Sequence, residues 1–407
     1  MGARRHPEHP GHVLGIDSGG SGVRVAVAPV DGPGQPLTWS SPTPAVVGAR
    51  GIDARSLLAQ VLPAAHDLLR EAGAARPAAA CVGAAGMAAL GGDLRAALPD
   101  ALARELGVRR LALAADGVIA YAGALGQRPG AVIAAGTGLI ALGTDLVTGW
   151  RRADGWGHLL GDCGSGAWIG RAGLEAAMRA HDGRRGGSAA LLARAEAAFG
   201  PAGELPGILY PRADRPAVLA SFAPEVGRCA AEDPVAARIL RQAARHIAEA
   251  AEAVCPHGGA PEGDDRGAAG TRGRAWDGRR TRAIPADPES IAHPTDLAGH
   301  AGPAGGRAAG SAAGRARTAT AVAASAGRAP ERAAGRGETY TVALTGGLFR
   351  MGEPLLRPLH AELSARLPRA RVVESVADPL TGALRVAAAL ATDRLLLPQD
   401  AALLRIA

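Results

Sequence analysis

The chain has 407 residues, of which 47% are apolar but only 3% aromatic. This length favours two domains, with cores built mostly from alanine, valine and leucine. The formal net charge is +7, and every basic residue is an arginine. The segment 256–337 holds 12 arginines against 8 acidic residues, so more than half of the excess charge falls there. The rest shows no basic stripe interleaved with aromatic residues, and we expect no nucleic-acid partner.

The cysteines and the apolar runs indicate the cellular compartment in which the protein works. Cys81, Cys163, Cys229 and Cys255 stand apart in the sequence, which indicates reduced thiols rather than a zinc site or a disulfide framework. Residues 1–12 lack the apolar stretch of a signal peptide, and no run approaches the roughly 18 apolar residues of a membrane span. The sequence therefore predicts a soluble, cytoplasmic protein without a membrane partner.

The first ordered stretch is predicted to be a β-hairpin around a glycine turn. Val13 to Ile16 form an apolar run that ends at Asp17, and residues 23–27 alternate valine with other residues after the turn Ser18-Gly19-Gly20-Ser21-Gly22. Gly19 and Gly20 allow positive φ, so that backbone N–H groups and the two serine hydroxyls gather around a phosphate. Asp17 can then hold the magnesium ion that a nucleotide brings. On its own the stretch fits an ordinary hairpin turn equally well, and it is not a P-loop because no Gly-Lys-Ser/Thr follows.

The order of elements after the hairpin predicts a mixed sheet, and the same pattern then begins again. A third strand at 35–41, a helix near 57–69, strands at 78–86 and 110–116, and helices near 93–106 and 117–125 give the order βββαβαβα. The second occurrence has a strand from Ala131, the turn Gly136-Thr137-Gly138, a hairpin, and a helix at 165–181. We interpret this as an internal structural repeat.

The second half continues past an irregular segment. A long helix is expected to end near Cys255, and 256–337 loses all periodicity, which predicts a disordered insertion. A strand at 340–345 then leads into a third glycine turn at Gly346-Gly347, followed by a helix, a strand and a closing helix to 394. The expected domains are a disordered N-terminus at 1–12, a first domain at 13–127, a second at 128–255 with 338–395, and the insertion.

These stretches together resemble a known superfamily. Gly15-Ile-Asp-Ser-Gly-Gly-Ser21, Gly136-Thr-Gly138, Gly155-Trp-Gly-His-Leu-Leu-Gly-Asp162 with Gly164-Ser-Gly166, and Thr345-Gly-Gly347 are similar to the motifs of the sugar kinase/actin/hsp70 superfamily. Within it the resemblance is to the BadF/BadG/BcrA/BcrD-type ATPases, and there to N-acetylglucosamine kinases. The implied fold is α/β, with two actin-like (ribonuclease H-like) domains whose mixed five-stranded sheets flank a nucleotide cleft.

The resemblance implies ATP and Mg²⁺ as cofactors and phosphoryl transfer to the 6-hydroxyl of an amino sugar. It implies that Asp17 holds the metal and that Asp116 is the general base. The implied ATP-binding residues are Gly19, Gly20, Ser21, Thr137, Gly138, Gly346 and Gly347. The implied sugar-binding residues are Asp116, Thr137, Gly155, Trp156, Gly157 and Asp162. A homodimer is compatible with the resemblance.

Phosphoryl transfer depends mostly on positioning and charge neutralisation, so this set of residue types suits the chemistry. Structural roles remain open for three of them: Asp116 as a helix N-cap, Trp156 as a core residue and Asp162 as a turn former.

Departures from the family pattern leave other functions open. Cys163 stands where the family has a glutamate, Ala115 where an asparagine precedes the base, and residues 41–47 contain no asparagine. The substrate could therefore be another amino sugar, such as glucosamine or N-acetylmuramic acid. Two further alternatives are an activator ATPase, which would hold an iron–sulfur cluster through cysteines, and a sugar sensor without catalytic activity.

Overall fold

The computed structural model describes residues 11–407, apart from residue 21 and the ranges 33–34, 49–50, 256–339 and 376–377. The predicted disordered insertion at 256–337, and all but the last two residues of the predicted N-terminal tail, lie outside the described residues.

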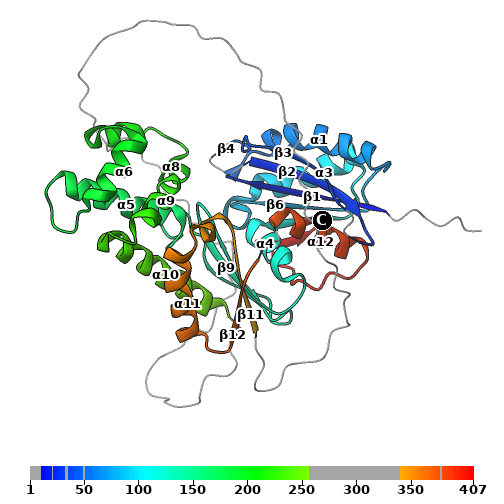
Figure 1. Ribbon diagram of the computed structural model, residues 1–407. Coiled ribbons are helices and arrows are strands. Elements are labelled where there is room, and N and C mark those ends of the chain that lie inside the picture. Colours follow the sequence, from blue (N-terminus) through cyan, green and yellow to red (C-terminus); the bar gives the residue numbers. More distant parts are fainter. Residues whose placement is uncertain (1–10, 21, 33–34, 49–50, 256–339, 376–377) are drawn as a thin grey trace, which may run out of the picture. The chain divides into compact units, whose positions relative to one another are not determined.

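The first sheet is mixed and has six strands, which are β1 (His12–Gly19), β2 (Gly22–Pro29), β3 (Leu37–Ser41), β6 (Ala79–Ala84), β7 (Leu111–Ala115) and β13 (Leu404–Ile406). They lie in the order β13-β7-β6-β1-β2-β3, with β1, β6 and β7 parallel (Figure 1). The expected number of five strands is wrong for this sheet, because the short β13 pairs antiparallel with β7 at its edge. A three-residue strand carries too little pattern to be recognised in a sequence.

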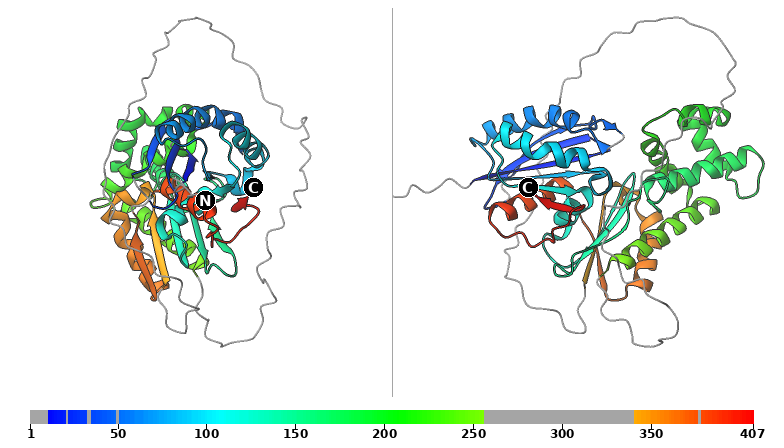
Figure 2. Two further views of the ribbon diagram at one scale, coloured as in Figure 1. Left: turned by 90° about the vertical axis from the view of Figure 1, so that its right-hand side faces the viewer. Right: turned by 180° about the vertical axis from the view of Figure 1, so that it is seen from behind.

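Helices cover both faces of the first sheet. The helices here are α1 (Ala54–Glu71), α2 (Met87–Leu90), α3 (Gly92–Leu106), α4 (Asp116–Leu125) and α12 (Pro379–Ala391), and a two-stranded ribbon of β4 (Val47–Gly48) and β5 (Gly51–Ile52) precedes α1. α1 and α3 pack together on one face, and α4 and α12 pack together on the other (Figures 1 and 2). α4 also contacts strands of the second sheet, described next.

The second sheet repeats the plan of the first. Its strands are β8 (Gly130–Ala135), β9 (Leu139–Thr144), β10 (Trp150–Asp154), β11 (Tyr340–Thr345) and β12 (Ala370–Glu374). Their order, β10-β9-β8-β11-β12, has the same pairing directions as β3-β2-β1-β6-β7: two antiparallel hairpins followed by two parallel additions. The predicted internal repeat is therefore confirmed, and the second sheet has the five strands that we expected.

The remaining helices accompany the second sheet. They are α5 (Gly166–His181), α6 (Ala189–Phe199), η1 (Ala202–Glu204), α7 (Leu205–Leu209), α8 (Arg215–Ser221), α9 (Ala223–Cys229), α10 (Pro234–Val254), η2 (Gly347–Met351) and α11 (Glu353–Arg366). Asp233 caps the N-terminus of α10, and its carboxylate accepts from the backbone N–H of Val235 and Ala236. Its apolar stripe packs against β8, β9 and β10, as the helical spacing of its apolar residues predicts.

α12 packs differently from the expectation. The sequence placed 338–395 with the second half, yet α12 contacts α4 and the strands β1 and β6 of the first sheet. Glycines make this approach close: a Cβ added at Gly382 would lie 1.7 Å from the carbonyl oxygen of Ile119, and one at Gly15 would lie 3.0 Å from Leu384. After residue 339, the strands β11 and β12 therefore join the second sheet together with α11, whereas α12 packs on the first sheet.

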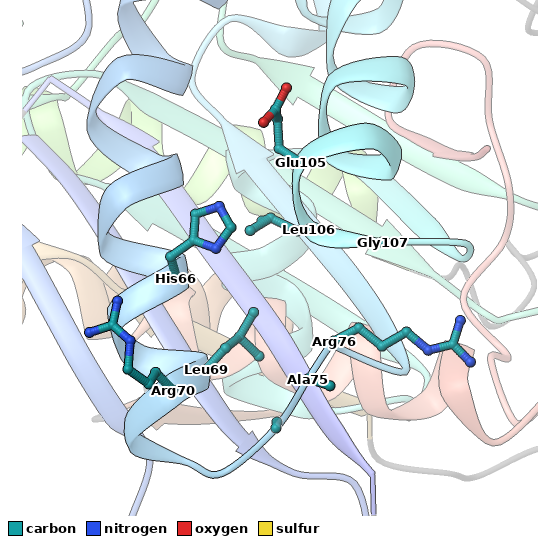
Figure 3. Close-up of a pocket in the computed structure, with 9 residues that line it drawn as sticks. His66, Leu69, Arg70, Ala75, Arg76, Glu105, Leu106 and Gly107 are labelled. Carbon is teal, nitrogen blue, oxygen red and sulfur yellow. The ribbon is translucent and has the colours of Figure 1, made fainter.

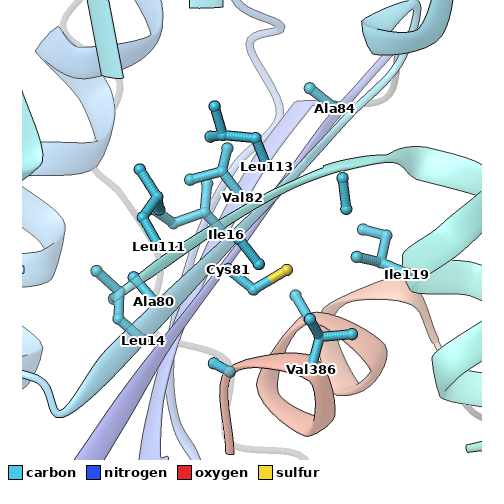
Figure 4. Close-up of a cluster of buried hydrophobic side chains, with 14 of the residues drawn as sticks. Leu14, Ile16, Ala80, Cys81, Val82, Ala84, Leu111, Leu113, Ile119 and Val386 are labelled. Atoms are coloured by element: carbon cyan, nitrogen blue, oxygen red, sulfur yellow. The ribbon is translucent and has the colours of Figure 1, made fainter. Parts of the chain in front are cut away.

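Cys81 belongs to the core between the first sheet and the helices α4 and α12. In Figure 4 the Cys81 sulfur points toward Ile119 and Val386, while Ile16 and Leu113 lie toward the opposite side of the strands. Cys81 is fully buried, and burial raises the pKa of its thiol strongly. The thiol is thus a core group.

Candidate active site

Asp17 and Asp116 lie at the same edge of the first sheet, where its parallel strands end. Asp17 is opposite Gly83 in the pairing of β1 with β6, and Gly83 is opposite Ala114 in the pairing of β6 with β7. Asp116 follows β7 directly as the first residue of α4. Ligands in α/β proteins bind at this edge, beyond the carboxyl ends of the strands.

Asp116 has the electrostatic environment of a proton acceptor. Burial raises the pKa of its carboxyl to about 6, the N–H of Gly117 opposes that rise, and the charge of Asp17 adds to it. Arg152 acts in the lowering direction and Asp162 in the raising direction. The N-cap position of α4 belongs to Ala115, and the carboxylate of Asp116 accepts only from the adjacent Gly117 N–H, at 2.9 Å, among the hydrogen bonds of the described residues. The arrangement therefore does not match the N-cap alternative.

Asp17 is held by an arginine that the sequence analysis did not single out. Arg24 lies opposite Asp17 in the hairpin, and its guanidinium donates to Asp17 Oδ2 from Nη2 at 2.5 Å and from Nε at 3.0 Å. Its Nη1 donates to Asp378 Oδ2 at 2.6 Å. Asp378 also caps α12 through the N–H of Thr381. Arg24 thus ties the first glycine turn to the start of α12.

The first glycine turn differs in detail from the expectation. Gly19 and Gly20 do not adopt positive φ, whereas Gly22 does, at +129°, and a Cβ there would lie 2.0 Å from the carbonyl oxygen of Ser41. No atom lies within 4 Å of a Cβ added at Gly19 or Gly20, so their backbone is open to a ligand. Ser18 is buried, and its hydroxyl has no hydrogen-bond partner among the described residues. Ser21 lies outside the described residues.

The two glycine turns of the second sheet lie side by side. β8 and β11 are parallel neighbours, and a Cβ at Gly346 (φ +110°) would lie 2.1 Å from the carbonyl oxygen of Ala135, directly before the Gly136-Thr137-Gly138 turn. The N–H of Gly166 donates to Gly136 O at 2.8 Å, so the turn rests on the start of α5. The Thr137 side chain is exposed, and no atom lies within 4 Å of a Cβ added at Gly347.

Asp162 packs against the second turn. A Cβ added at Gly138 would lie 2.6 Å from Asp162 Oδ2, and Asp162 Oδ1 accepts from the N–H of Gly157 at 3.2 Å. Asp162 has φ +54°, and its own N–H donates to Asp154 Oδ1 at 2.5 Å. Asp162 thus serves as a turn former, as one alternative proposed, and at the same time it contributes a charge that acts on Asp116.

Trp156 is not a core residue. It is 57% exposed, and the guanidinium carbon of Arg152 lies 4.4 Å from its ring centroid. Gly155 and Gly157 on either side have positive φ, +74° and +85°, which only glycine adopts readily. The sequence analysis missed Arg152, Arg24 and the turn-bracing Asp154. The detectable signal for Arg24 was a single charge inside an otherwise buried strand.

The residues at Asp17 fit a magnesium ion that arrives with a nucleotide. Within the described ranges, no group of three or more histidine, cysteine or acidic side chains could hold a metal ion alone. Asp17 Oδ1, however, is not used by Arg24. Mg²⁺ typically binds through one or two carboxylates together with phosphate oxygens and water, and one free carboxylate oxygen beside an open glycine turn meets that need.

A separate cavity of about 530 Å³ lies between the end of α1 and the end of α3. His66, Arg70, Arg76 and Glu105 line it (Figure 3). None of the candidate site residues contributes to its lining. Among the described helices, none is both long and apolar enough to cross a membrane.

The repeated sheets and their glycine turns define an ATPase of the class that is built from two copies of one α/β unit. The chain belongs to the BadF/BadG/BcrA/BcrD ATPase family, which it matches over residues 14–263, and family membership implies the use of ATP.

Two proteins are similar to this chain, one over less than half of it and the other over most of it. An N-acetylmuramic acid/N-acetylglucosamine kinase from Clostridium acetobutylicum is 28% identical over 174 residues, which are 42% of this chain and 55% of the relative. The chain thus spans about half the length of that relative. A crystal structure titled "Putative N-acetylglucosamine Kinase", from Chromobacterium violaceum, is 25% identical with a TM-score of 0.57, and the match covers 92% of this chain and 98% of that one.

Proposed function

We propose that the protein is an ATP-dependent sugar kinase that transfers the γ-phosphoryl group of ATP to the 6-hydroxyl of an amino sugar, with N-acetylglucosamine as the first candidate. The observation that carries this proposal is that Asp17 and Asp116 lie at the same edge of the first sheet, where its parallel strands end next to the open backbone of Gly19 and Gly20. Burial raises the pKa of the Asp116 carboxyl to about 6. The names of both similar proteins support an amino sugar as the acceptor.

On the donor side, the open backbone of Gly19 and Gly20 and the turns at Gly138 and Gly347 would bind ATP, and Asp17 would hold Mg²⁺. Bound Mg²⁺ would neutralise charge on the phosphates. Arg24 keeps Asp17 at the end of β1, so that the free carboxylate oxygen is fixed in place.

On the acceptor side, Asp116 would accept the proton of the sugar hydroxyl as the bond to phosphorus forms. A base with a pKa near 6 is ionised at neutral pH and is still basic enough to take that proton. The exposed ring of Trp156 offers an apolar face to a pyranose, and Gly155, Gly157 and Asp162 shape the turn that carries it.

A related acceptor is a second candidate, because the relative from Clostridium acetobutylicum is named for N-acetylmuramic acid as well. The experiment is a screen of sugar-dependent ADP release across glucose, glucosamine, N-acetylglucosamine, N-acetylmannosamine and N-acetylmuramic acid, with and without Mg²⁺. We expect release with at least one amino sugar and none with Mg²⁺ withheld. ATP hydrolysis that no sugar stimulates would overturn the proposal.

A further inference from the structure

We propose that Arg152 is a positioning residue of the acceptor site, which fixes the Trp156 ring as the surface for the sugar and places a positive charge beside Asp116. The inference rests on the proposed function and adds a residue to it. Arg152 lies in β10, in the hairpin that precedes the Gly155-Trp156-Gly157 turn.

The guanidinium of Arg152 is held from two directions. Its Nη2 donates to Gly155 O at 2.6 Å and its Nε donates to Asp154 O at 3.1 Å. A planar guanidinium held by two acceptors has little freedom to rotate. Its position over the Trp156 ring, 4.4 Å from the centroid, is therefore fixed by the backbone of the same turn.

Trp156 needs such a support because the fold gives it little other packing. Its side chain is 57% exposed, and the glycine on each side restricts its backbone less than any other residue would. Arg152 covers one face of the ring. The other face can then lie against a pyranose in a defined orientation.

The charge of Arg152 has a second effect, on Asp116, because α4 packs against the hairpin that carries Arg152. A Cβ added at Gly117 would lie 2.8 Å from Leu142 Cδ1, and Leu142 is opposite Arg152 in the pairing of β9 with β10. The groups that act on Asp116 come from four places: Asp17 on β1, Asp162 on the turn, the Gly117 N–H of its own helix, and Arg152 on β10. Both acids disfavour the ionised form of Asp116. Arg152 is the cation of that set, and an arginine remains protonated even though burial lowers its pKa.

The first experiment compares Arg152→Met, Arg152→Lys and Trp156→Ala in sugar-dependent ADP release. We expect Arg152→Met to raise the sugar KM about two- to fivefold, the usual worth of an exposed cation–π contact, with the ATP KM unchanged. In the Trp156→Ala background, Arg152→Met should add little to the change in sugar KM, because the arginine acts through the ring. Arg152→Met should also shift the fall of kcat/KM at low pH, where Asp116 becomes protonated, to a higher pH. Arg152→Lys keeps a charge but not the two hydrogen bonds to the backbone, so it should return this fall to the wild-type pH without lowering the sugar KM.

Arg151→Met is the matched control. Arg151 is the neighbouring residue of β10, and its guanidinium donates to Cys255 O at 2.9 Å instead of to the turn. We expect this control to keep both KM values. Equal changes in the sugar KM and the ATP KM of Arg152→Met, or fully additive effects of Arg152→Met and Trp156→Ala, would show that Arg152 is merely structural.

The second experiment does not need activity. Because the folded pKa of Asp116 lies above its ordinary value of 3.8, ionisation of Asp116 destabilises the folded state, so stability falls as pH rises from about 4 to about 6. The difference in unfolding free energy between the wild type and Asp116→Asn, measured by denaturant titration from pH 4 to 8, isolates this window. We expect the same comparison, made with Arg152→Met in both proteins, to raise the upper limit of this pH range by about 1 pH unit. With Arg151→Met in both proteins, the upper limit should stay where it is.

If Arg152→Met left the upper limit of this pH range unchanged, the proposed effect of the Arg152 charge on Asp116 would be overturned. Failure of the kinase function itself would appear separately, as a wild-type protein without sugar-dependent ADP release but with the shifted window. The two failures are therefore distinguishable.

Discussion

As the proposed general base, Asp116 would have to meet two demands that normally conflict. Burial and the neighbouring acids make it a stronger base, and Arg152 together with the Gly117 N–H keeps its pKa at about 6, below neutral pH. A carboxylate with its ordinary pKa would be a weak proton acceptor, and one raised above 8 would be protonated in the cell. The balance depends on side chains from three separate elements, β1, β10 and the turn at Asp162.

Asp116→Asn should lower kcat by about 10²–10⁴-fold, because the amide cannot accept the proton of the sugar hydroxyl. Binding of an ATP analogue should be nearly unchanged, since the glycine turns remain. In the wild type we expect kcat/KM to fall tenfold per pH unit below about pH 6, as Asp116 becomes protonated. ADP release and analogue binding measured side by side check both statements, and near-normal turnover of Asp116→Asn would contradict the assignment as general base.

Asp17→Asn should weaken the dependence on Mg²⁺ rather than the chemistry. We expect the Mg²⁺ concentration needed for tight binding of an ATP analogue to rise at least about tenfold, because an amide oxygen binds a hard cation less strongly than a carboxylate. Fluorescence titration with Mg²⁺ measures this without turnover.

Asp378→Asn is a suitable control for Asp17→Asn. It removes the other acid that Arg24 contacts, while an asparagine can still cap α12. If Asp378→Asn changes the Mg²⁺ requirement as much as Asp17→Asn does, Asp17 acts only through its ion pair.

At this scale the sequence revealed the residues at strand ends and missed those inside strands. Asp17, Asp116 and the glycine turns were recognisable because a polar residue or glycine that ends an apolar run marks the ligand-binding edge of a sheet. Arg24 and Arg152 lie within strands, and besides their near neighbours in the sequence they act on acids that are distant in it, Asp378 for Arg24 and Asp116 for Arg152. Such long-range charge pairs depend on tertiary packing, which periodicity does not encode.

At the scale of elements, the repeat of strand, glycine turn and strand was predictable because each copy carries its own local pattern. The partner of α12 was not predictable. Its apolar stripe indicates that one face is buried, but not against which sheet. The partner is decided by glycines that allow a close approach. Gly382 of α12 lies against Ile119 and Gly123 of α4, and Gly15 of β1 lies against Leu384 of α12.

Gly382→Ala should destabilise the protein by roughly 1–3 kcal/mol or more, because the added methyl group would meet backbone atoms of α4 and the two helices would have to separate. Gly207→Ala is the matched control, since no atom lies within 4 Å of a Cβ there and its φ is compatible with alanine. That control should be neutral or stabilising by up to about 1 kcal/mol. Denaturant unfolding of both variants gives the comparison, and equal stabilities would show that α4 and α12 are not closely packed at Gly382.

At the scale of the whole molecule, Cys255 at the end of α10 and Tyr340 at the start of β11 lie together. The Cys255 thiol and the Tyr340 hydroxyl form a hydrogen bond with each other. Cys255 O also accepts from Arg151 of β10, so the end of α10 is anchored to the second sheet. A connection between these residues therefore needs to bridge only a short gap.

Replacing 256–337 with a short Gly/Ser linker should therefore change the unfolding free energy by less than about 1 kcal/mol, since surface changes away from the core seldom exceed that and loop-closure entropy changes slowly with length. The sugar-dependent kcat should stay within about twofold, because no site residue belongs to the replaced segment. A second variant should carry the same linker together with Tyr340→Phe, which removes the hydrogen bond to Cys255 and should cost about 1 kcal/mol. Denaturant unfolding and ADP release of both proteins test the reasoning. A loss of more than about 2 kcal/mol from the linker alone would show that the segment packs against the rest of the chain, contrary to the prediction from its composition.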